Sequence, residues 1–159
     1  MKKGFTLIEM LIVIAVIAIL VGIALPRLRG MREEGNYAKA NGELKTLQAA
    51  LESYFIHYKA YPVQITTPDA EWQDDDAGSL TKAVPKLIST PLKDPFTPGG
   101  ATEYRYATSA SVNSDYYVIF SVGFDGIPDI TGIGADGLLN GTDDDDIFVT
   151  NGDGLFVLP

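Results

Sequence analysis

The chain has 159 residues, enough for one modest domain beside a separate anchor. It contains no cysteine and one histidine, which excludes disulfides, zinc–thiolate sites and histidine clusters. The net charge is −9, and no lysine or arginine follows Arg105. Since phosphate binding needs cationic side chains, the C-terminal half is not expected to bind nucleic acid.

The N-terminal region combines a short basic leader, residues 1–4, with an apolar run at residues 5–25, here called the apolar stem. Thr6 and Glu9 are its polar side chains. A helix of 21 residues would be about 32 Å long, enough to cross the roughly 30 Å core of a bilayer. The two lysines of the leader predict a cytoplasmic N-terminus, so residues 26–159 are expected on the far side of the membrane.

The helical pattern continues beyond the apolar stem. Spacings of three and four residues predict one apolar helix face, made of Tyr37, Ala40, Leu44, Leu47, Leu51, Tyr54 and Tyr58. Pro26 should kink or loosen the helix, and Pro62 should end it. We therefore expect one long helix from Phe5 to about Lys59, with an apolar half and an amphipathic half.

Residues 62–100 carry six of the nine prolines and predict a loop with one short helix near Leu80–Ser89, in which Trp72 is expected to be buried. Three β-type runs follow, at Glu103–Ala107, Asp115–Val122 and Ile147–Thr150. Residues 123–146, here called the acidic loop, are rich in glycine and aspartate and predict irregular structure. The fold class expected is α+β, with the amphipathic half of the helix packed on a small antiparallel sheet.

Glu9 is the informative residue of the apolar stem, because a charged side chain within a membrane-spanning run is costly and calls for a partner. A signal peptide would have a shorter apolar core followed by a small-residue cleavage site, which is absent after this run. A plain membrane anchor fits the length of the run but leaves Glu9 unexplained.

The segment Lys3-Gly4-Phe5-Thr6-Leu7-Ile8-Glu9 resembles the processing motif of the prepilin family, which includes type IV pilins and type II secretion pseudopilins. The resemblance implies a pilin-like fold, cleavage after Gly4 by a prepilin peptidase, and methylation of the new N-terminus, Phe5. It also implies that Glu9 meets the terminal amine of a neighbouring subunit. Two charges that are each costly in lipid offset one another when they pair.

Later segments resemble the major pseudopilin of type II secretion. The end of the helix, Leu51-Glu-Ser-Tyr54 before Tyr61-Pro62, is one of them. Lys93-Asp94-Pro95-Phe96 with Tyr104-Arg105-Tyr106 is similar to the family's D-P-W-G-x-P-Y-x-Y stretch, with phenylalanine in place of tryptophan. The run from Phe120 to Gly126 is similar to F-S-L-G-A-D-G, after which the family has a calcium-binding loop.

The acidic loop by itself predicts a hard-cation site. Its carboxylate and amide side chains are Asp125, Asp129, Asp136, Asn140, Asp143, Asp144, Asp145 and Asp146. Calcium takes six to eight oxygen ligands on a loop that can wrap around it. An EF-hand is excluded, because with Asp136 first, Ile147 would stand at the twelfth position. Which residues bind follows from the resemblance to the family loop, which implies Asp125, Asp143, Asp145 and Asp146 as ligands, with Asp136 as an alternative first ligand. A solvated acidic surface is the competing interpretation.

The resemblance implies a structural subunit and no enzyme. Subunits would wait in the inner membrane and polymerise through their N-terminal helices into a periplasmic filament that pushes folded proteins through the outer membrane. The implied partners are copies of itself, the prepilin peptidase, the inner-membrane assembly platform and minor pseudopilins. One alternative is a type IV pilus subunit for adhesion, motility or DNA uptake. Another is a membrane-tethered hydrolase with paired aspartates, for which the sequence offers no nucleophile–base pattern.

Overall fold

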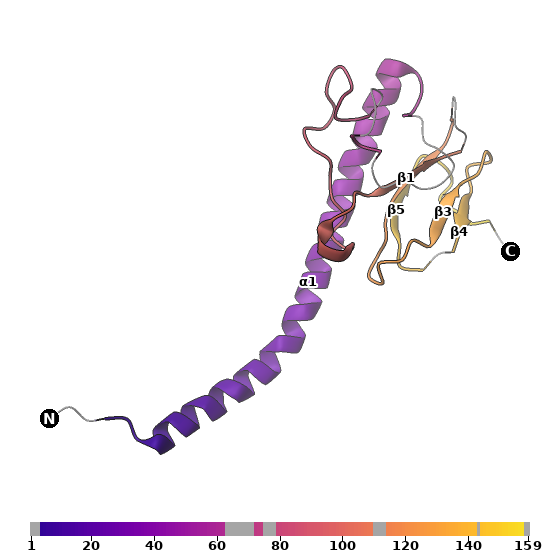
Figure 1. Ribbon diagram of the computed structural model, residues 1–159. Helices are drawn as coiled ribbons and strands as arrows, with labels where there is room; N and C mark the ends of the chain where they lie inside the picture. The colour runs from indigo at the N-terminus through magenta and orange to yellow at the C-terminus, as the bar shows by residue number, and fades with distance from the viewer. Residues whose placement is uncertain (1–3, 63–71, 75–78, 110–113, 143, 158–159) are drawn as a thin grey trace. The chain divides into compact units, whose positions relative to one another are not determined.

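The computed structural model describes residues 4–62, 72–74, 79–109, 114–142 and 144–157, with the backbone alone described at 26–29 (Figure 1). The chain divides into two compact units, Met1–Gly35 and Asn36–Pro159. Helix α1 (Leu7–Tyr58) has residues in both. The helix predicted from Phe5 to about Lys59 is confirmed to within two residues at either end, and its backbone stays helical through Pro26.

In the first unit, the apolar stem buries none of its large side chains. Their exposed fractions run from 47% to 83% between Phe5 and Leu25. Among the described residues, α1 is the one helix that is long and apolar enough to cross a membrane. An apolar surface of this size is unfavourable in water, so the apolar stem requires lipid or other protein around it.

In the second unit, the other half of α1 supplies one wall of the core. Five of the seven predicted stripe residues are buried: Ala40, Leu44, Leu47, Leu51 and Tyr54. The prediction is wrong for Tyr37 and Tyr58, which are 48% and 45% exposed. They lie at the two ends of the stripe, where the sheet no longer covers the helix. There Tyr37 stacks on the exposed ring of Phe124.

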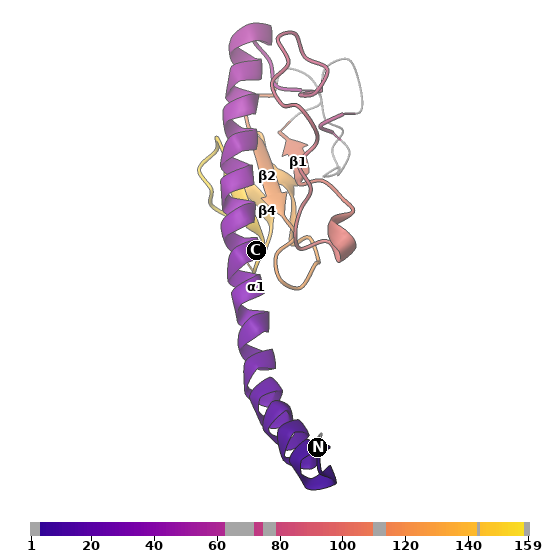
Figure 2. The same ribbon diagram turned by 90° about the vertical axis from the view of Figure 1, so that its left-hand side faces the viewer.

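A three-stranded antiparallel sheet packs against this half of α1 (Figure 2). Its order is β1-β2-β5, with β1 at Arg105–Thr108, β2 at Tyr117–Ser121 and β5 at Ile147–Thr150. All three predicted strands are therefore confirmed: β1 begins two residues later and ends one residue later than predicted, β2 is shorter at both ends, and β5 has the predicted bounds. All five residues of β2 are buried, because its two faces belong to two different core clusters. That explains why its sequence is a continuous apolar run rather than an alternating one.

The sequence predicted irregular structure for the acidic loop, and this prediction is wrong. The loop contains a hairpin of β3 (Ile130–Ile133) and β4 (Leu139–Gly141). Both strands are short and glycine-bearing, so their local signal is weak. Tertiary burial stabilises them: Ile130, Ile133 and Leu139 pack against the outer face of β2. The C-terminal segment adds a parallel bridge between Phe156 and Leu139.

The short helix predicted near Leu80–Ser89 is wrong. Ser79 accepts one helix-like hydrogen bond from Ala83, but the Val84 N–H donates to the Tyr58 hydroxyl, and the amides of Leu87 and Ile88 donate back to the carbonyl of Leu80. The chain thus reverses after a single turn, and Pro85 has no N–H to continue a helix. In the same region, the burial expected for Trp72 is confirmed: it is 4% exposed and donates to the Tyr104 carbonyl at 2.7 Å.

Candidate functional site

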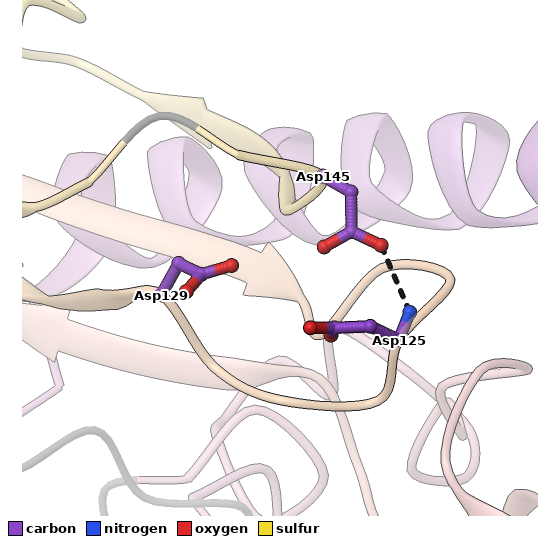
Figure 3. Close-up of side chains that lie close together, drawn as sticks. All are labelled: Asp125, Asp129 and Asp145. Carbon is purple, nitrogen blue, oxygen red and sulfur yellow. Dashed lines mark hydrogen bonds between the residues drawn. The ribbon is translucent and has the colours of Figure 1, made fainter.

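Three aspartates converge in the second unit at the ends of the strands. Asp125 follows β2, Asp129 precedes β3 and Asp145 precedes β5, and one carboxylate oxygen of each lies within 4.8 Å of the others. Figure 3 shows the carboxylates of Asp129 and Asp145 reaching from two chain segments toward Asp125. The antiparallel pairing of β2 with β5 brings these segments together.

Backbone amides bind one carboxylate oxygen each of Asp145 and Asp146. Asp125 N–H donates to Asp145 Oδ2 at 2.9 Å, and the N–H groups of Asp129 and Ile130 both donate to Asp146 Oδ2 at 2.8 Å. Asp129 Oδ2, Asp145 Oδ1 and Asp146 Oδ1 are buried, and the described residues offer them no hydrogen bond. Unsatisfied buried carboxylate oxygens are costly, and a bound cation would satisfy them.

The acidity of two of these groups reflects the same crowding. Burial, the largest cause, raises the pKa of Asp146 to about 6, although two backbone N–H donors oppose the shift. The pKa of Asp129 is also raised, first by loss of hydration and then by the charges of Asp125, Asp144 and Asp145. A field that disfavours a further negative charge favours a cation at the same place.

Close backbone approach holds the site together at Gly123, which has φ of 64°. A Cβ atom at Gly123 would lie 2.4 Å from the Asp145 carbonyl oxygen. Only glycine tolerates both this φ and this proximity. Gly141 is similar, since its Cβ would lie 2.1 Å from the carbonyl oxygen of Asp129. Glycine therefore permits the two ligand-bearing segments to touch.

The structure brings two predicted ligands, Asp125 and Asp145, into one group. Asp146 is adjacent; its Oδ2 accepts the N–H groups of Asp129 and Ile130, and its Oδ1 has no partner among the described residues. Asp136 is elsewhere, in the β3–β4 turn, where its Oδ1 accepts the Leu138 N–H at 3.1 Å, and Asp143 lies outside the described residues. Asp129 was not among the predicted ligands, because its place before a strand is evident only once the hairpin is known.

This donor set fits calcium. Asp125, Asp129 and Asp145 supply carboxylate oxygens on a loop whose glycines permit wrapping, and the unpartnered oxygen of Asp146 lies beside them. Calcium prefers oxygen ligands and tolerates irregular geometry. The remaining ligands would come from backbone carbonyls or water.

At the N-terminus, the residues of the processing motif are accessible. Gly4 has no atom within 4 Å of the position of a Cβ, and Phe5 is 81% exposed. Glu9 forms a capping box with Thr6: its carboxylate accepts the Thr6 N–H at 2.8 Å and the Thr6 hydroxyl at 2.7 Å. The T-x-x-E spacing is a sequence signal for this cap that the membrane-based interpretation of Glu9 passed over.

Family comparisons identify both regions. The prokaryotic N-terminal methylation motif matches residues 1–25, and the type II secretion system protein G family matches residues 27–150. The chain belongs to the type II secretion system protein G family. It is therefore a major pseudopilin, a structural subunit of the pseudopilus, as the resemblance predicted. Its α+β fold, with one long apolar N-terminal helix and small antiparallel sheets, agrees with the pilin-like expectation.

Two relatives named type II secretion system core protein G are similar over nearly their whole length. Type II secretion system core protein G of Aeromonas hydrophila is 31% identical over 144 residues, which cover 91% of this pseudopilin and 90% of the relative. The Klebsiella pneumoniae protein of the same name is 27% identical, with coverages of 90% and 91%. A fimbrial protein of Pseudomonas aeruginosa is 35% identical over 71 residues, less than half of either chain. No solved structure matches the chain.

Proposed function

We propose that this pseudopilin is made as an inner-membrane precursor and assembles into a periplasmic filament whose growth pushes folded proteins through the outer membrane. The observation that carries the proposal is the exposed apolar stem, joined to a unit with its own buried core. Such a helix is stable in lipid and equally stable among copies of itself, because both surroundings are apolar. The subunit can therefore leave the membrane for the filament without exposing the apolar stem to water.

Processing precedes assembly in this proposal. The prepilin peptidase cleaves after Gly4, and the new N-terminus, Phe5, is methylated. Glu9 then pairs with the terminal amine of a neighbouring copy. It is the one ionisable side chain between Phe5 and Leu25, so no other side chain of the apolar stem neutralises it within the membrane, and the amine of a neighbouring copy is the proposed counter-charge. The assembly platform and minor pseudopilins are the proposed partners, and the role is structural rather than catalytic.

Calcium is the proposed ligand of the acidic loop. The three buried carboxylate oxygens without partners support the proposal, since a solvated acidic surface would leave them open to water. Magnesium fits less well, because it demands near-octahedral geometry and gives up water reluctantly. By linking the segments before β3 and β5, the cation stabilises the second unit.

The test uses a type II secretion strain that lacks its own protein G. Expression of this chain together with its secretion components should yield short sheared filaments and restore export of a folded enzyme to the medium. Filaments without restored export would contradict the secretion role. Long surface fibres with twitching or DNA uptake would instead support the type IV pilus alternative, for which the partial match to a fimbrial protein is the observation.

A further inference from the structure

An open groove of about 480 Å³ lies beside the cation site, where α1 enters the second unit. Tyr37 and Phe124 form its aromatic border, with rings 6.3 Å apart and nearly parallel. Both rings are about half exposed. Asp144 stands on the rim with an exposed side chain and is not one of the three clustered carboxylates. The groove thus combines aromatic faces with a carboxylate that lies outside the cluster of three aspartates.

These surfaces fit a guanidinium group. Arginine stacks its planar head on aromatic faces and donates paired hydrogen bonds to a carboxylate, whereas lysine presents a compact, strongly hydrated charge. The described lining residues of the groove include no lysine or arginine. Arg32 is exposed, and the described residues give it no ion pair.

The proposed pairing between Glu9 and the Phe5 amine sets the offset between neighbouring copies in the filament, and this offset determines which residue of the next copy lies opposite Tyr37. If Glu9 of one copy pairs with the Phe5 amine of the next, the next copy is displaced by four residues, or about 6 Å at 1.5 Å per residue. Every residue of an identical copy takes the same displacement along the axis. Along α1, which is continuous from Leu7 to Tyr58, a shift of four residues aligns residue 32 of the next copy with Asn36, one residue before Tyr37.

We propose that the groove bordered by Tyr37, Phe124 and Asp144 receives Arg32 of the next copy in the filament. This interface rests on the proposed Glu9 pairing and adds a second contact with the same step. The apolar stem supplies the area of association, and the arginine contact fixes the register, because opposite charges suppress alternative alignments.

A charge swap in the full-length chain tests the interface. Arg32→Glu and Asp144→Arg should each lower the yield of sheared filaments about tenfold, because each places like charges opposite one another. The combined Arg32→Glu, Asp144→Arg variant should recover most of the yield. Lys86→Glu, at an exposed lysine, is the control and should assemble normally. Normal yields from both single variants, or no recovery in the combined variant, would overturn the inference.

Cross-linking gives a second readout that does not depend on the charge swap. Because the chain has no cysteine, Met31→Cys and Thr142→Cys can be expressed separately and then together in one cell. A short bismaleimide should produce dimers within filaments from the mixed cells alone, and Met31→Cys mixed with Lys86→Cys should give none. If filaments form but the mixed cells give no cross-linked dimer, the inference is refuted and the proposed function still stands. Absence of filaments from the unaltered chain refutes the proposed function and this inference with it.

Discussion

The apolar stem and the acidic loop both hold carboxylates that no cation of the described residues neutralises. Glu9 is a single charge on an exposed apolar helix, and its two hydrogen bonds come from Thr6 one turn away. Asp125, Asp129 and Asp145 form a cluster assembled by the fold, with buried oxygens that lack donors. The comparison supports the two proposals made above, that another copy pairs with the apolar stem and that a cation binds the acidic loop.

The largest expected effect lies at the start of the apolar stem. Gly4→Leu should leave the whole population as a longer precursor, because a bulky side chain would block the peptidase at a position that is open in the wild-type chain. Intact-mass measurement of membrane-extracted protein checks this, and the wild type should begin at methylated Phe5. A mature wild-type chain that begins at Met1, or after Leu25, would contradict the processing assignment.

The filament yields of variants at Glu9 and Thr6 distinguish the role of the Glu9 charge from its role in the capping box. Glu9→Val and Glu9→Gln should both insert into the membrane yet lose filament yield by about tenfold or more, because neither carries the negative charge needed for an ion pair with an amine. Glutamine can keep the capping box, so a defect in Glu9→Gln isolates the charge. Thr6→Ala removes the cap, keeps the charge and should assemble. Normal filaments from Glu9→Gln would show that the cap is the relevant role.

Metal removal should affect the acidic loop and not the apolar stem. Calcium at a hundred times its Kd stabilises the folded state by about 2.7 kcal/mol, which predicts a rise in Tm of about 5–10 °C. Melts of the detergent-solubilised chain in EDTA, calcium and magnesium measure it. Asp125→Ala, Asp129→Ala and the double variant Asp145→Ala, Asp146→Ala should lose most of the response, whereas Asp153→Ala should keep it. Equal melts in EDTA and calcium would favour a solvated acidic surface.

Glycine-to-alanine substitutions should have opposite effects on stability in the acidic loop and in α1. Gly123→Ala should lower the free energy of unfolding by about 1–3 kcal/mol, because alanine at positive φ is strained and its Cβ meets the Asp145 backbone. Gly42→Ala, on α1, meets no atom within 4 Å and should stabilise by up to about 1 kcal/mol. Denaturant titration measures both. Equal effects of the two substitutions would mean that the loop does not need glycine.

A smaller effect is expected from pH. With its pKa raised to about 6, Asp146 binds a proton more tightly in the folded state than in the unfolded chain. The metal-free protein should therefore lose stability as pH rises from about 4 to about 6. Calcium binds the deprotonated form, so its stabilisation should grow over the same range. Asp146→Asn should flatten both trends, and Tm measured against pH, with and without calcium, checks this.

Local patterns in the sequence were sufficient to predict the long helix and the processing motif. The three-and-four spacing from Ala40 to Tyr54 and the apolar run ending at Leu25 each depend on neighbours within a few turns. The strand at Ile147–Thr150 was predicted with its observed bounds for the same reason. Even the capping box of Thr6 and Glu9 was available from its spacing, although membrane arguments drew attention away from it.

Tertiary structure alone decided how the acidic loop is organised. The sequence shows that aspartates crowd there, but nothing local places Asp129 beside Asp145 and Asp136 elsewhere. That choice follows from two long-range facts: β5 pairs with β2, and β3 and β4 bury Ile130 and Leu139 against the outer face of β2. Pairing across long intervals of sequence depends on burial of surfaces that are remote along the chain. The residue pattern of a short glycine-rich segment therefore does not predict which remote surface it packs against.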